Sequence, residues 1–238
     1  MSAGGSSSTE LMAAPAGHTG ADRRIARAVF VFIVAMILAG FAKNFYLRLW
    51  LGTRPLIPTA WLHGYVMTAW LLLFTTQLVL VACGRTDLHR RLGHLGAYLA
   101  SLVVIVGVLT IAVRARLVVP SASLGEYALV FVAFDGLSLV LFALLTGAAV
   151  LARARPPTHR RLMTYAMVAL LPPAFGRFVA YLTHEHVQLT VLALMVLTVL
   201  VALTVDAVRI GYLHRASLWS GILIVLANIA TYYSQLAT

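Results

Sequence analysis

Stretches of about 20 consecutive, mostly apolar residues recur along the whole chain, and a helix of that length crosses the roughly 30 Å hydrocarbon layer of a membrane. A soluble domain needs charge on about a quarter of its residues. Of the 238 residues here only 11% are charged, whereas 61% are hydrophobic. The chain is therefore expected to be an all-α, polytopic membrane protein.

The apolar pattern predicts a bundle of seven transmembrane helices. Pro58 and Thr59 suit the start of the second helix, and Thr86 and Asp87 suit the cap of the third. Residues 1–22 are rich in Ser, Gly and Ala and are expected to form a disordered tail before a single domain at 23–238. The expected helices cover 28–48, 60–82, 90–113, 126–151, 160–183, 187–209 and 217–236.

Basic residues gather in alternate loops. Twelve are expected on the side of the N-terminus, whereas the opposite loops hold only Lys43, Arg48, Arg54, Arg114 and Arg116. This asymmetry predicts a cytoplasmic N-terminus in a bacterial cytoplasmic membrane. The net charge of +11 is accordingly assigned to contact with anionic lipid headgroups and not to nucleic acid. Other membrane subunits are the remaining partner class that is expected.

A tetrapeptide, HRRL, occurs twice, at residues 89–92 and 159–162. Superimposing the two copies suggests a duplicated helical hairpin, residues 60–113 and 126–183, in which both copies begin a helix at the cytoplasmic face. The four arginines of these copies are expected to set the orientation of the helices in the membrane. They are Arg90, Arg91, Arg160 and Arg161.

The segments "LHGYVMTAWLLLFTTQLVLVACGRTDLHRRLGHLGAYLA" and "THRRLMTYAMVALLPPAFGRFVAY" resemble an uncharacterised family of bacterial multi-pass membrane proteins, a domain of unknown function. That resemblance covers about residues 60–183 and implies fold and location, but no activity. A weaker resemblance is to the dihaem b-type membrane cytochromes, to which His63, His94 and His159 are similar in part. It implies haem b, although the expected helix at 126–151 has no histidine to complete that pattern.

Ionisable residues inside the membrane are costly and tend to face the bundle interior. His63, Asp135 and Arg177 are expected at similar depth on the outer side, with Lys43 and Asn44 at the rim. They could form a ligand pocket or a proton relay. Alternatively, Asp135 and Arg177 form an ion pair that only locks two helices. A kink is expected beside Arg177, at Pro172, Pro173 and Gly176.

On the inner side, Gln77, His94 and Asp206 are expected at comparable depth, either as an interhelical hydrogen-bond cluster or as support for a ligating histidine. The candidate haem ligands are His63 with His184 or His186 outside, and His94 with His159 inside. His89 and His159 also share one depth, as bis-imidazole ligation requires. No metal-ion site is expected, because Cys83 is the only cysteine and no donor cluster is apparent.

The sequence contains no glycine-rich phosphate loop, nucleophile elbow or H-E-x-x-H motif, so soluble-enzyme chemistry is not expected. Two functional classes remain. The favoured one is a non-enzymatic membrane protein, either an accessory subunit or a small-solute or proton permease that uses His63, Asp135 and Arg177. The alternative is a b-haem or quinone-linked electron-transfer protein, which as an enzyme would be a membrane oxidoreductase.

Overall fold

The computed structural model describes residues 20–53, 55–118, 125–183 and 185–236, and all regular secondary structure in these ranges is helical. Seven helical spans within them are long and apolar enough to cross a membrane, which confirms the expected polytopic bundle. Most of the expected tail lies outside the described residues. Its last part does not, because the first helix already begins at Gly20.

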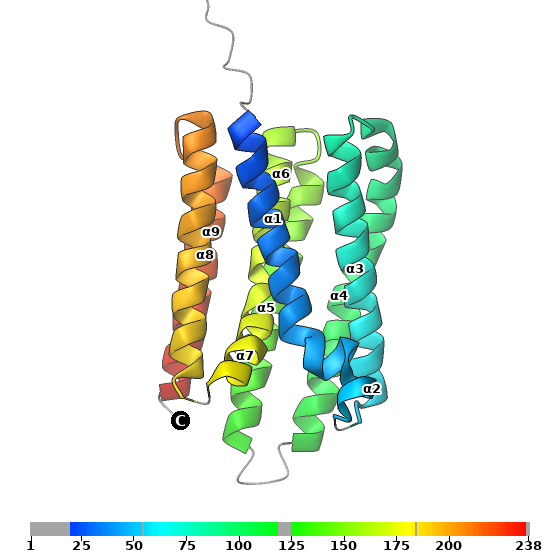
Figure 1. Ribbon diagram of the computed structural model, residues 1–238, viewed down its shortest axis with the longest axis vertical. Coiled ribbons are helices and arrows are strands. Elements are labelled where there is room, and N and C mark those ends of the chain that lie inside the picture. Colours follow the sequence, from blue (N-terminus) through cyan, green and yellow to red (C-terminus); the bar gives the residue numbers. More distant parts are fainter. Residues whose placement is uncertain (1–19, 54, 119–124, 184, 237–238) are drawn as a thin grey trace, which may run out of the picture.

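Seven spans arise from ten elements, because two spans are interrupted and one short helix lies in a connection (Figure 1). The first span is α1 followed by a π-helical turn, η1, and the fifth is α6 followed by α7. The elements are α1 Gly20–Phe41, η1 Ala42–Tyr46, α2 Arg48–Leu51, α3 Pro58–Ala82, α4 Thr86–Val118, α5 Gly125–Leu151, α6 Pro156–Ala169, α7 Leu171–Leu182, α8 Val187–Ile210 and α9 Arg215–Leu236.

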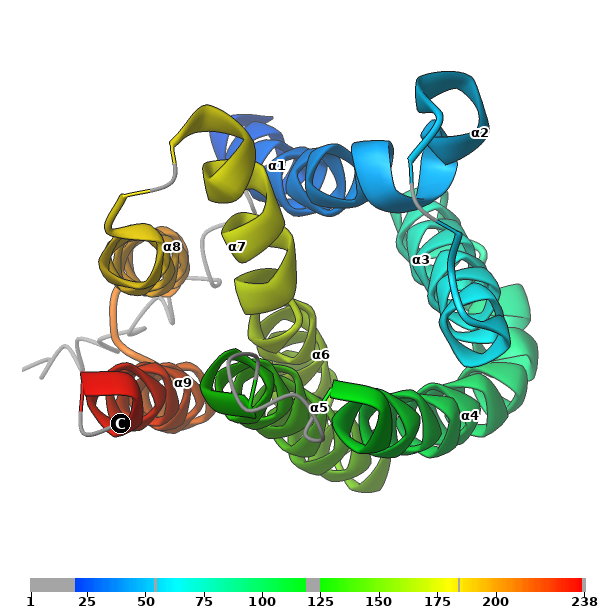
Figure 2. The ribbon, with the colours of Figure 1, turned by 90° about the horizontal axis from the view of Figure 1, so that it is seen from below.

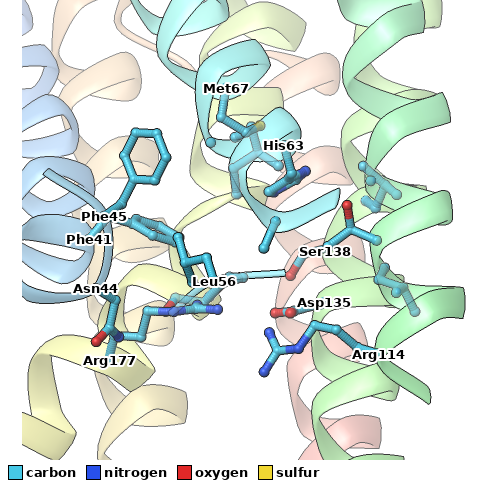
Figure 3. A pocket seen from close by; sticks show the side chains of 18 of the residues that line it. Phe41, Asn44, Phe45, Leu56, His63, Met67, Arg114, Asp135, Ser138 and Arg177 are labelled. Carbon is cyan, nitrogen blue, oxygen red and sulfur yellow. The ribbon is translucent and has the colours of Figure 1, made fainter. Parts of the chain in front are cut away.

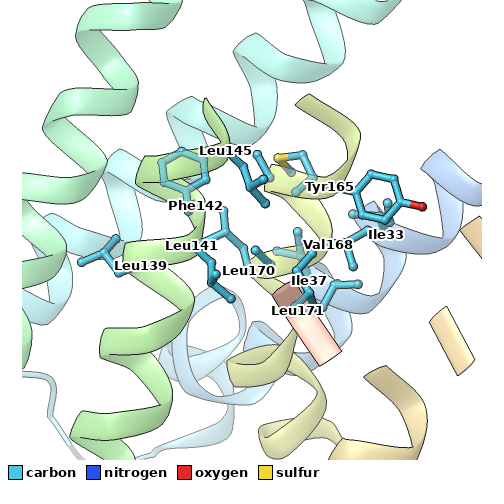
Figure 4. Packing of buried hydrophobic residues seen from close by; sticks show 14 of the residues in the cluster. Ile33, Ile37, Leu139, Leu141, Phe142, Leu145, Tyr165, Val168, Leu170 and Leu171 are labelled. Atoms are coloured by element: carbon cyan, nitrogen blue, oxygen red, sulfur yellow. The ribbon is translucent and has the colours of Figure 1, made fainter. Parts of the chain in front are cut away.

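The α6–α7 span lies at the centre, and the other spans surround it (Figure 2). In its most apolar window 67% of the residues are buried, against at most 39% in any other span. Its buried face carries Tyr165, Val168 and Leu171, which pack with Phe142 of α5 and Ile37 of α1 (Figure 4). This packing holds the bundle together, since lipid tails give apolar helices no hydrophobic reason to associate.

The expected kink in the fifth span is a break in the helix at Leu170. Pro172 and Pro173 occupy the first turn of α7, where a missing N–H costs nothing. Inside a continuous helix, by contrast, their rings would clash with the carbonyl groups one turn earlier. The first span is interrupted as well, because after Phe41 the chain widens into the π-helical turn η1.

The two ends of the bundle differ in charge. We call the end that carries the α3–α4, α5–α6 and α8–α9 turns the basic face, and it lies at the top of Figure 1. The other end, with α2 and the end of α7, is the opposite face. The described side chains that give the basic face its charge are Arg85, Arg90, Arg91, Arg153, Arg155, Arg160, Arg209 and Arg215.

Candidate functional site

A cavity of about 350 Å³ lies in the half of the bundle near the opposite face. The cavity lies between the α3–α4 hairpin on one side and α1 and α7 on the other, and side chains from α5 also line it (Figure 3). Most of its wall is apolar. The polar or charged side chains in the wall are Asn44, Tyr46, His63, Thr110, Arg114, Asp135, Ser138 and Arg177.

Helical spacing explains how these side chains reach one cavity. On α4, Gly107, Thr110 and Arg114 follow one another at intervals of three and four residues, and they therefore lie on one helical face. Both helix interruptions also reach the cavity, through Asn44 of η1 and through Leu170 at the α6–α7 break. Interrupted helices at membrane depth are tolerated where their backbone lines a cavity.

Gly64 of α3 leaves space for the ring of Phe45, which forms part of the cavity wall. The ring of Phe45, from η1, lies so close to Gly64 of α3 that a Cβ atom on Gly64 would overlap it. Phe45 also contacts Trp61 and Tyr65, with ring centroids 5.5 and 5.7 Å away. The interrupted end of α1 is therefore packed directly onto the helix that carries His63.

His63 presents an unsatisfied imidazole to this cavity. Its Nδ1 is buried and has no hydrogen-bond partner among the residues that the structure describes. The hydroxyl of Ser138, a residue only 5% exposed, is likewise unpaired within the described part of the chain. A buried polar atom without a partner costs about 1–3 kcal/mol, so Nδ1 of His63 is a candidate contact for a ligand, and the hydroxyl of Ser138 is a second polar group of the cavity wall.

Arg177 and Asp135 both line the cavity, but they do not pair directly. The described salt bridges are Arg85–Asp87 and Arg161–Asp206. Arg177 instead donates from Nη1 to the carbonyl oxygen of Pro173 at 2.7 Å, and its guanidinium lies 4.6 Å from the ring centroid of Phe41. The ion pair considered as the structural alternative is thus not formed, and most guanidinium N–H groups of Arg177 stay available to a ligand.

Of the five residues expected in this pocket, four line the cavity, namely Asn44, His63, Asp135 and Arg177. Lys43 is not among the lining residues, and its Nζ lies 5.6 Å from the ring centroid of Tyr181. Arg114 was expected in a loop, yet α4 continues to Val118 and carries it into the wall. The charged side chains in the wall are thus Arg114, Asp135 and Arg177.

The structure does not bring Gln77, His94 and Asp206 together. In the amide orientation that satisfies both of its ends, Gln77 donates to Nδ1 of His89 at 2.7 Å. His94 is exposed on α4. Asp206 accepts from Nε of Arg161 at 2.7 Å and from the hydroxyl of Ser217 at 2.6 Å.

Arg161 therefore needs a different explanation from the other HRRL arginines. It is only 4% exposed and its guanidinium is paired with Asp206, whereas Arg90, Arg91 and Arg160 are exposed. Its role is to join α6 to α8, and, through Ser217, to α9. Orientation in the membrane, which was expected to explain all four HRRL arginines, therefore does not account for the buried Arg161.

The two HRRL histidines meet at the basic face, with the ring centroids of His89 and His159 6.3 Å apart. Nδ1 of His159 lies 2.8 Å from the carbonyl oxygen of Ala149, to which it must donate. Nδ1 of His89 instead accepts from Gln77. In the neutral rings, Nε2 of His159 is thus a free acceptor, whereas Nε2 of His89 carries the proton.

In these tautomers the pair can exchange a proton, whereas bis-imidazole haem ligation needs a lone pair on both Nε2 atoms and therefore the other tautomer of His89. The remaining haem candidates are dispersed. His63 lines the cavity, His94 is exposed on α4, and His186 is exposed before α8. His184 lies outside the described residues.

Seven helical spans that are long and apolar enough to cross a membrane, with a charged cavity between five of them, define an integral, multi-pass membrane protein. Comparison of the chain with protein-family models, with curated proteins and with solved structures finds no match.

Proposed function

We propose that the protein is a small-solute permease of the bacterial cytoplasmic membrane, and that the cavity binds a monoanion with an apolar body. The carrying observation is the guanidinium of Arg177, held in a largely apolar cavity beside a carboxylate that it does not pair with. A charge at this depth costs at least about 2.5 kcal/mol and typically marks a substrate path. The guanidinium of Arg177 favours an anionic ligand over a cation.

The helix interruptions favour transport over static binding. Substrate sites of transporters commonly use discontinuous helices, and π-helical turns are frequent at functional sites. Here the π-helical turn η1 and the break at Leu170 both line the cavity. Either interruption can act as a hinge without breaking a continuous ladder of backbone hydrogen bonds. With the basic face in the cytoplasm, the cavity lies in the outer half of the membrane.

The test is uptake of radiolabelled benzoate, a small monoanion with an apolar ring, by proteoliposomes that contain the full chain. We expect saturable uptake that falls at least tenfold in Arg177→Gln. The matched control is Arg116→Gln, which removes the same charge from an exposed position of α4 outside the cavity wall. Uptake that is equal in both variants, or equal to that of empty liposomes, would refute the permease and favour an accessory subunit.

Electron transfer through haem b is the other function that the sequence favours. The candidate ligands His63, His94 and His159 are dispersed over the bundle, so purified protein is expected to be colourless. A Soret band that shifts on dithionite reduction and disappears in His159→Ala would overturn this expectation. Such a result would place haem at the basic face, away from the cavity.

A further inference from the structure

A second hollow lies on the outside of the bundle, at the level of the basic face. It is a groove of about 720 Å³ between α5, α6 and α9, closed at one end by the α8–α9 turn. Leu145, Leu162 and Leu223, one from each helix, line its apolar part. Trp219 is 66% exposed and Leu223 42% exposed, so the groove opens toward the lipid around the bundle.

The end of the groove at the basic face is polar and positively charged. Arg215 is exposed and has no hydrogen bond or ion pair within the part of the chain that the structure describes. His214 accepts a hydrogen bond on Nδ1 from the backbone N–H of Ala216 at 3.1 Å, so Nε2 carries its proton. Partial burial lowers the pKa of His214. Arg215 also begins the 22-residue helix α9, whose N-terminal dipole favours an anion.

A serine side chain lies deeper in the groove. Ser220 is 3% exposed and lines the groove, yet its hydroxyl has no hydrogen-bond partner among the described residues. Thr198 of α8 and Thr110 of α4, by contrast, donate their hydroxyl groups to a carbonyl oxygen one turn earlier. Ser220 lies five residues beyond Arg215, about 7.5 Å deeper along the helix at about 1.5 Å per residue. A donor at that depth suits an ester carbonyl below a phosphate.

We propose that this groove binds one anionic glycerophospholipid from the leaflet at the basic face. The phosphate contacts Arg215 and Nε2 of His214, an ester carbonyl accepts from Ser220, and one acyl chain lies along Leu145, Leu162 and Leu223. The positive end, the apolar length and the opening toward lipid match this occupant in charge, polarity and position.

The test is native mass spectrometry of the full chain, purified in detergent, delipidated and titrated with palmitoyl-oleoyl phosphatidylglycerol or phosphatidylcholine. We expect one phosphatidylglycerol adduct at low lipid, at least fivefold more abundant than the phosphatidylcholine adduct, and at least fivefold weaker in Arg215→Ala. Arg90→Ala, which removes an equally exposed arginine of the same face outside the groove, should bind as the wild type does.

A second variant, Leu223→Trp, fills the groove from a partly exposed position and should also abolish the adduct without unfolding the chain. Equal adducts with both lipids, or an undiminished adduct in both groove variants, would overturn the proposal. So would competition by millimolar inorganic phosphate that displaces the lipid fully, because the site would then recognise phosphate alone. The lipid proposal would also be refuted if a second protein co-purified with the chain, stayed bound through delipidation and occupied the groove.

Discussion

Asp135 and Asp206 both lie inside membrane-spanning helices, yet their surroundings are opposite. Asp206 is held by Arg161 and Ser217 at hydrogen-bond distance, whereas Asp135 lines a cavity and forms no described salt bridge. A buried ion pair that loses one partner leaves an uncompensated charge, at a cost of about 3–5 kcal/mol. A cavity-lining carboxylate without a partner has no such contact to lose.

We therefore expect Asp206→Asn to lower the free energy of unfolding by about 3 kcal/mol, since it leaves Arg161 buried and unpaired. Asp135→Asn, the matched control, should change it by about 0.5 kcal/mol or less. Thermal unfolding of both variants in the same detergent measures the difference. Equal destabilisation would mean that Asp135 also serves stability, which would weaken its assignment to a ligand site.

The pairing of Arg161 with Asp206 can be tested in a second way. Replacing both by apolar residues of similar volume, as Arg161→Met with Asp206→Leu, removes the pair without leaving an orphan charge. The double variant should be at least as stable as either single variant, although the hydroxyl of Ser217 and the carbonyl oxygen of Pro157 each lose one partner. Additive losses in the double variant would show that the two residues act independently.

At the scale of elements, α1 crosses α7 at a point where no side chain fits. A Cβ atom on Gly40 would overlap the backbone of Ala174, and Tyr181 donates to the carbonyl oxygen of Gly40 at 3.1 Å. Small residues let transmembrane helices approach this closely. The crossing places Phe41 and the π-helical turn beside Arg177, so it also shapes the cavity.

Gly40→Ala is expected to separate α1 from α7 and to destabilise the protein by about 1–3 kcal/mol, as overpacking generally does. Gly147→Ala provides the matched control, because a Cβ atom there meets nothing within 4 Å. That control should be neutral or slightly stabilising, given the better helix propensity of alanine. Comparison of the two melting temperatures tests the crossing, and a neutral Gly40→Ala would show that it is looser than described.

The spans were predictable from the sequence because apolar length is a local property of the chain. The contacts of the polar residues were harder to predict. Asp206 was expected to meet Gln77 and His94, but which helices become neighbours is decided by packing of the whole bundle, and α8 lies beside α9 and α7 instead of α3. Arg114 was missed for a local reason, since the expected helix stopped at 113 and the observed one continues to Val118. The spacing of Arg114 from Thr110 and Gly107, at intervals of four and three residues, was the pattern in the sequence that could have placed it on the same helical face.

For the whole molecule, the charge difference between the two faces implies one orientation in the membrane. Cys83, the only cysteine, is exposed in the α3–α4 turn at the basic face, so the native chain carries its own topology probe. In intact bacterial cells an impermeant maleimide should leave Cys83 unlabelled, and it should label Cys83 in inverted vesicles.

A control for labelling places the cysteine on the opposite face, as Glu185→Cys with Cys83→Ser. This variant should be labelled in intact cells, because residue 185 is exposed between α7 and α8. The reverse labelling pattern would put the basic face outside. The cavity would then open toward the cytoplasm, and the proposed direction of solute entry would be wrong.

The binding of a monoanion in the cavity is tested most directly by fluorine-19 NMR of 4-fluorobenzoate, titrated with the full chain in nanodiscs. We predict saturable binding that Arg177→Gln weakens at least tenfold and that Asp135→Asn strengthens several-fold, because the carboxylate repels the anion. The uncharged isostere 4-fluorobenzamide should bind weakly and respond to neither variant. Binding that is equal for the two probes, or that falls in Asp135→Asn as much as in Arg177→Gln, would contradict the account.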